Sequence, residues 1–143
     1  MDRSGRELLT VPRPNDVMSA RKLRDGQIVC VLSNRSVLRL DRAGKELKSF
    51  AVPGVFTHGN DILPNGHVLV PMAWQNRVAE YDASGKEVWQ AGVMQAMSAH
   101  RLPNGHTLVG SQQHPTRLVE LDRKGKEVWQ HTSNTYVVRA RRR

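Results

Sequence analysis

Apolar and polar residues follow one another along the chain in short, partly alternating runs that favour β-strands. The run RLVELD (117–122) alternates as a half-buried strand does, and HTLVG (106–110) and EVWQHT (127–132) are further short runs of this kind. Tight turns separate them, because Asn-Gly in PNG (103–105) suits a hairpin and Gly125 can take a left-handed conformation. The pattern predicts four short strands joined by turns, with no helix.

This unit returns at a period close to 40 residues. YDASGKEVWQ at 81–90 is nearly repeated as LDRKGKEVWQ at 121–130, and related blocks begin at Leu40 and at the start of the chain. A second block, out of phase with the first, places glycines at Gly26, Gly66 and Gly105. Four antiparallel strands repeated at this period are typical of a β-propeller blade.

The sequence therefore predicts an all-β fold, a partial β-propeller of four-stranded antiparallel blades. We expect residues 1–143 to form a single propeller segment, with three full blades and an orphan strand at each end. The predicted parts are an orphan outer strand at 6–11, blades at 17–51, 57–92 and 96–132, and an orphan inner strand at 136–142.

The motif Asp-x-x-Gly-Lys-Glu-x-Trp resembles the blade signature of quinoprotein (PQQ-like) propellers, and the x-Leu-Pro-Asn-Gly-x-x-Leu block resembles repeats of arylsulfotransferase-like bacterial propellers. The motif is complete in two copies, with Asp82, Gly85, Lys86, Glu87 and Trp89 in one and Asp122, Gly125, Lys126, Glu127 and Trp129 in the other. The resemblance implies that each tryptophan docks between neighbouring blades. Lys48 and Leu9 stand at the tryptophan position in the other two copies, so those contacts must be made differently.

Three blades and two orphan strands do not make an ordinary closed ring, since propellers close with about 4–8 blades. An open arrangement would leave apolar faces and strand edges on the first and third blades. We expect either that the chain is a fragment of a longer propeller, whose missing blades complete the ring, or that copies of the chain associate through these faces.

The net charge of +9 raises the alternative of nucleic acid or another polyanion as partner. Four arginines stand in the last five positions, 139–143, but the chain has no nucleic-acid motif and only seven aromatic residues, so this alternative is disfavoured. The single cysteine, Cys30, lies in an apolar strand, where a small buried role is expected. No apolar run is long enough for a membrane span, and the first residues carry no secretory signal.

Candidate binding residues lie on or just before the predicted innermost strands, whose ends surround the central channel of a propeller. They are His58, Asp61, His100, Arg21, Arg101 and Arg141. Arg21, Asp61, His100 and Arg141 share one position of the repeat. His67 and His106 both follow a PNG turn, which makes them repeat residues and not a converging pair.

The resemblance to arylsulfotransferases implies catalytic histidines near His58 and His100, but the register of the two residues does not match, and further blades would be needed. We expect no metal site, because no third ligand accompanies His58 and Asp61. We also expect no cofactor, because quinone enzymes need a calcium ion and the chain has no calcium loop. The leading expectation is a non-enzymatic scaffold that binds a protein or small ligand through loops or channel mouth. The alternative is a fragment of a larger propeller enzyme, inactive alone.

Overall fold

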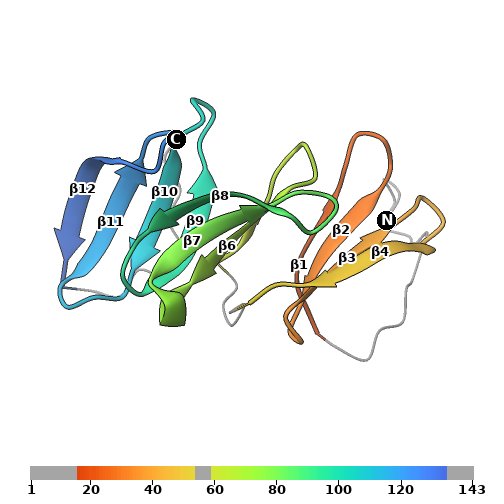
Figure 1. The fold of residues 1–143 in the computed structure, drawn as a ribbon, viewed down its shortest axis with the longest axis horizontal. Helices are drawn as coiled ribbons and strands as arrows, with labels where there is room; N and C mark the ends of the chain where they lie inside the picture. The colour runs from red at the N-terminus through yellow and green to blue at the C-terminus, as the bar shows by residue number, and fades with distance from the viewer. Residues whose placement is uncertain (1–15, 54–58, 135–143) are drawn as a thin grey trace, which may run out of the picture.

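The computed structural model describes residues 16–53 and 59–134, and within these ranges twelve strands form three antiparallel sheets of four (Figure 1). The first sheet contains β1 (Val17–Lys22), β2 (Ile28–Leu32), β3 (Ser36–Leu40) and β4 (Glu46–Ala51). The second contains β5 (Asp61–Ile62), β6 (Val68–Met72), β7 (Arg77–Tyr81) and β8 (Glu87–Gly92). The third contains β9 (Ala96–Arg101), β10 (Thr107–Ser111), β11 (Thr116–Leu121) and β12 (Glu127–Ser133).

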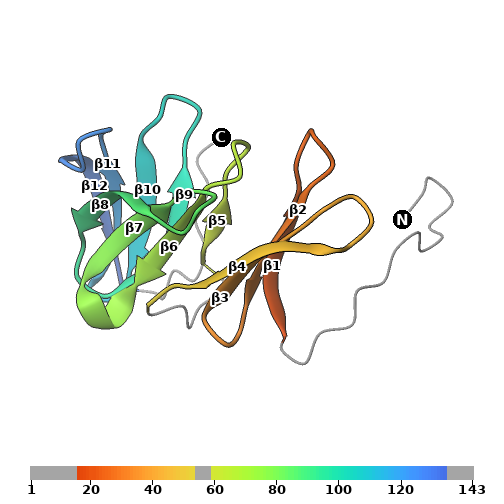
Figure 2. The same ribbon diagram turned by 45° about the vertical axis from the view of Figure 1, so that its right-hand side comes forward.

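The strands of each sheet pair in chain order, and the three sheets stand one after another with their faces together (Figures 1 and 2). Among the first strands of the sheets, β5 contacts both β1 and β9, and β4, β8 and β12 lie at the far edge. This arrangement confirms the predicted fold class. The chain is a partial β-propeller, its three sheets are blades, and β1, β5 and β9 are the inner strands.

The Asp-x-x-Gly part of the repeat forms the same turn in successive blades. The Asp82 carboxylate accepts hydrogen bonds from the backbone N–H groups of Ser84 (2.8 Å) and Lys86 (3.0 Å). Gly85 follows in the left-handed region, with φ of 89°, which a side chain would disfavour. Asp122 and Gly125 build the same turn in the third blade.

One local departure from the sequence prediction lies between β6 and β7. Ala73–Gln75 form a single turn of 3-10 helix, where no helix was expected. Asn76 ends it in the left-handed conformation, with φ of 52°, and its N–H donates to the Ala73 carbonyl oxygen. Asparagine tolerates this conformation better than most residues, so Asn76 can end the turn directly before β7.

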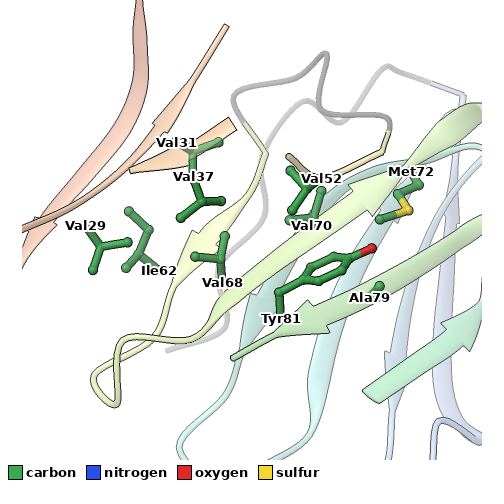
Figure 3. Packing of buried hydrophobic residues seen from close by; sticks show 10 residues of the cluster. All are labelled: Val29, Val31, Val37, Val52, Ile62, Val68, Val70, Met72, Ala79 and Tyr81. Atoms are coloured by element: carbon green, nitrogen blue, oxygen red, sulfur yellow. The ribbon is translucent and has the colours of Figure 1, made fainter. Parts of the chain in front are cut away.

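The middle blade is buried on both faces because its strands alternate. Val68, Val70 and Met72 of β6 face the first blade and pack with residues such as Val29 and Val31 (Figure 3). Leu69 and Val78 belong instead to the cluster shared with the third blade, which includes Val109 and Val119. Cys30 is buried in a third cluster on the first blade, with Leu32, Leu38 and Leu40.

The two seams between blades use different residues at the same two positions of the repeat. At the second seam Trp89 packs against the apolar cluster, and its indole Nε1 donates to the Arg123 carbonyl oxygen at 2.9 Å. At the first seam the tryptophan position holds the exposed Lys48, and Phe50, two residues later, packs over Gly85. The corresponding residue of the second blade is the small Ala91, which packs over Gly125.

Trp129 occupies the signature position of the third blade and is 44% exposed. Its ring stacks on His131 of the same strand, with ring centroids 6.3 Å apart. The orphan strands predicted at 6–11 and 136–142 lie outside the described residues, as does Leu9.

Candidate functional site

The inner strands bring three chemically different side chains to one position of the repeat. Arg21, Asp61 and His100 each stand five residues before the glycine of the following turn, on β1, β5 and β9. The residues that pack blades repeat along the chain, whereas this position changes from guanidinium to carboxylate to imidazole. Such a position is where a repeat fold is expected to carry specific binding.

Asp61 and His100 form a pair between the second and third blades. The His100 Nδ1 atom lies 3.2 Å from Asp61 Oδ2, and the same oxygen accepts the backbone N–H of Arg101 at 3.1 Å. The side chains are only 12% (His100) and 20% (Asp61) exposed. A proton on Nδ1 directs the imidazole toward the carboxylate and leaves Nε2 as its acceptor nitrogen.

The environment of Asp61 keeps its carboxylate ionised. Burial alone would raise the pKa of Asp61, but the hydrogen bonds from His100 and from the Arg101 backbone, together with electrostatic attraction to His100 and Arg21, lower it below its ordinary value. The site therefore contains a fixed negative charge next to a guanidinium and an imidazole.

Arg21 and Asp61 make the same kind of contact to the next blade. The Arg21 guanidinium donates from Nη1 to the Ile62 carbonyl oxygen at 2.7 Å, and Asp61 accepts from the Arg101 N–H. Ile62 and Arg101 are equivalent residues of the repeat, since each stands four positions before its turn glycine. These side chains thus also join neighbouring inner strands, independently of any ligand.

The backbones of the second and third blades approach each other closely around Gly59. The Gly59 carbonyl oxygen accepts the backbone N–H of Ala99 at 2.8 Å. A Cβ atom on Gly59 would overlap the Met97 carbonyl oxygen and the Ser98 Cα atom. One blade earlier, the Ser19 hydroxyl donates to the Asn60 side-chain oxygen. The second and third blades therefore meet backbone to backbone, and the first and second through side chains.

The backbone of Arg101 donates to Asp61, whereas its side chain lies at the seam between the second and third blades. Its Nη2 atom lies 2.7 Å from the Glu80 carboxylate, and its guanidinium lies over the Trp89 ring, 5.1 Å from the centroid. Glu80 is 7% exposed and also contacts His67 Nδ1 at 2.7 Å. In the third blade His106 and Glu120 form the equivalent contact at 2.8 Å.

His58 and Arg141 lie outside the described residues. The blade-motif residues Asp82, Gly85, Asp122 and Gly125 form turns, and Trp89 forms a seam. Sequence reasoning missed Glu80, Asn60 and Ser19. Glu80 carried a signal, because it repeats as Glu120 in front of the Asp-x-x-Gly turn, at a strand position where a charge needs a partner.

Comparison with known proteins supports the fold. No protein-family profile and no curated protein matches the chain. Solved structures do match, although they share less than a fifth of their residues with it. A structure titled streptogramin B lyase is 15% identical over 90% of this chain and 44% of its own, with a TM-score of 0.64.

Two further structures show the same likeness. A structure titled eukaryotic initiation factor is 12% identical over 87% of this chain and 34% of its own, with a TM-score of 0.63. A Bacteroides caccae protein of unknown function is 18% identical over 86% of this chain and 48% of its own, with a TM-score of 0.58. The chain thus spans less than half the length of each neighbour.

Within the described ranges, no group of three or more His, Cys, Asp or Glu side chains is arranged to hold a metal ion. The same residues include no helix of the length and apolarity that crossing a membrane requires.

Proposed function

We propose that this chain is a non-enzymatic β-propeller scaffold that binds a small ligand or a protein segment at the mouth formed by its inner strands. The single observation that supports this is the convergence of Arg21, Asp61 and His100 from three successive blades. The site combines a guanidinium donor, an ionised carboxylate and an imidazole, so it suits a polar ligand with both donor and acceptor groups.

We also propose that residues 1–143 form one propeller segment, with 6–11 and 136–142 as strands of flanking blades. The exposed face around Trp129 corresponds to the face that Trp89 uses against the third blade. Its cover would be further blades of the same propeller or a second copy of the chain. Light scattering coupled to gel filtration measures the molar mass of the chain in solution. A compact, stable monomer would contradict the proposal that a second copy covers this face.

Ligand-observed NMR with a library of small carboxylates, phosphates, amines and polyols tests the binding proposal. Compounds that bind the wild-type chain should lose at least tenfold in affinity with Asp61→Asn and with Arg21→Gln. His131→Gln, on the outer strand β12, is the matched control and should bind normally. Hits that survive both inner-strand substitutions would refute the location of the site.

The second candidate is a part of a larger propeller enzyme of the quinoprotein or arylsulfotransferase-like kind, inactive alone. The Asp61–His100 pair favours it, because a carboxylate that orients an imidazole can make Nε2 a proton acceptor. Assay of the chain with aryl sulfates and aryl esters should show no turnover under the scaffold proposal. Turnover that disappears with His100→Gln would favour the enzyme instead.

A further inference from the structure

Basic residues gather on one end of the three blades. The turns β1–β2 and β3–β4, and their counterparts in the other blades, lie at the same end because the strands are antiparallel (Figure 1). Eight exposed basic residues occupy this end, which we name the turn rim: Lys22, Arg24, Arg42, Lys45, Lys86, Arg123, Lys124 and Lys126.

The charges of the turn rim are not neutralised by ion pairs. Among the described residues, none of the eight pairs with a carboxylate. Arg42 and Arg123 donate to the Asp25 and Asn104 carbonyl oxygens, which fixes their side chains over neighbouring turns. By contrast Arg77, the first residue of β7, and Arg117, the second residue of β11, pair with Glu87 and Glu127, which begin β8 and β12 directly after turns of the rim.

The aspartates in the turns of the rim are engaged by the backbone. There are four, and each accepts hydrogen bonds from N–H groups of its own turn: Asp25, Asp41, Asp82 and Asp122. Their carboxylates stabilise the turns, while the basic side chains of the rim remain exposed to solvent. Three exposed glutamates, Glu46, Glu87 and Glu127, begin the outer strands at this end. Arg77 and Arg117 neutralise Glu87 and Glu127, so the eight basic residues face four aspartates and Glu46, which leaves an excess of positive charge.

We propose that the turn rim binds the phosphodiester backbone of a nucleic acid without reading its sequence. Phosphate contacts need only positioned donors and positive charge, so neither a base-reading motif nor stacking aromatics is required. The turns of the rim contain no Trp, Tyr or Phe that could stack on a base. The net charge of +9 would draw the polyanion toward the molecule.

The other anionic partners are a sulfated glycan and a membrane surface. The sulfates of a glycan share the chemistry of phosphates, so the test below includes heparin retention without duplex binding as a result that would overturn the proposal. A membrane surface is usually bound with exposed apolar side chains beside the basic ones. The two most exposed large apolar side chains, Trp74 and Met94, lie in loops at the opposite end of the blades. Near the rim each outer strand carries one half-exposed aliphatic residue, Leu47, Val88 or Val128.

The test uses Arg24→Gln, Lys86→Gln and Lys124→Gln together, one from each blade, since none of these side chains makes a hydrogen bond within the described structure. Fluorescence anisotropy measures the affinity for two duplexes of about 20 base pairs and unrelated sequence across a salt series. With about 0.9 counterions released per phosphate contact, the slope of log K against log salt should fall by about 2.7. Both duplexes should bind equally.

The matched control is Lys48→Gln, Arg77→Gln and Arg117→Gln, which removes the same charge away from the turn rim and should change the slope by less than about 1. Equal loss in both triples would overturn the proposal, because net charge alone would then explain binding. So would binding that depends only on arginines 139–143, or strong retention on heparin or anionic vesicles without duplex binding. Each result leaves the inner-strand site untouched, since Arg21, Asp61 and His100 are not altered.

Discussion

The Asp61 carboxylate joins two blades through its charge, so it should make stability depend on pH. Its pKa is lowered in the folded chain by His100, the Arg101 N–H and Arg21 against the effect of burial. Because this pKa is lower in the folded chain than in the unfolded chain, the ionised carboxylate stabilises the fold at any pH above the unfolded pKa. This contribution is lost as the pH falls through the pKa of the folded chain.

Asp61→Asn should lower the free energy of unfolding by about 1–3 kcal/mol near neutral pH, the usual cost of unsatisfied buried hydrogen bonds. Urea unfolding of both proteins, measured from neutral pH downward, should show this difference shrinking below about pH 5. A difference that stays constant into acid would contradict the assignment.

Gly59 offers a second test, of steric rather than electrostatic origin. Gly59→Ala should cost about 1–3 kcal/mol, because its Cβ atom would force the inner strands of two blades apart. Gly92→Ala is the control, since its Cβ atom would meet no heavy atom within 4 Å and should change stability by less than about 0.5 kcal/mol. If urea unfolding gave the same loss in free energy of unfolding for both variants, the close approach at Gly59 would not contribute to stability.

Among the outer strands, β8 and β12 carry the same tryptophan in different surroundings. Trp89→Phe removes the hydrogen bond to the Arg123 carbonyl and should cost about 1 kcal/mol. Trp129→Phe keeps an aromatic ring beside His131 and should cost less than Trp89→Phe in a monomeric chain, since the Trp129 ring is 44% exposed. Paired urea titrations measure this, and a larger cost for Trp129 would indicate that its face is covered in solution.

The strands and turns were predictable because period-two alternation and Asn-Gly or Asp-x-x-Gly turns are local signals. The 3-10 turn at Ala73–Gln75 was not, because it depends on the loop closing through Asn76. The position shared by Arg21, Asp61 and His100 followed from alignment of the repeat. The Asp61–His100 contact did not, because it requires the spatial placement of two blades. The seam role of Glu80 and Arg101 was missed for the same reason.

Over the whole molecule, burial predicts an order of local stability. The middle blade has Val68 and Val70 packed on one side and Leu69 on the other, so β6 and β7 should open only with global unfolding. The outer strands β4 and β12, which consist largely of exposed residues, should exchange much earlier. Hydrogen–deuterium exchange with mass spectrometry measures this order, and uniform protection across the three blades would contradict it.

The two seams between blades are filled by different residues, and this restricts how the repeats of the gene can recombine. Lys48 with Phe50 fits one neighbour, and Trp89 with Ala91 fits another, so a bulky residue occupies only one of the two positions at each junction. Exchange of a whole blade transfers both codons together, whereas a crossover inside the outer strand would separate them. Transfer of one alone would put two large rings, or none, between the sheets.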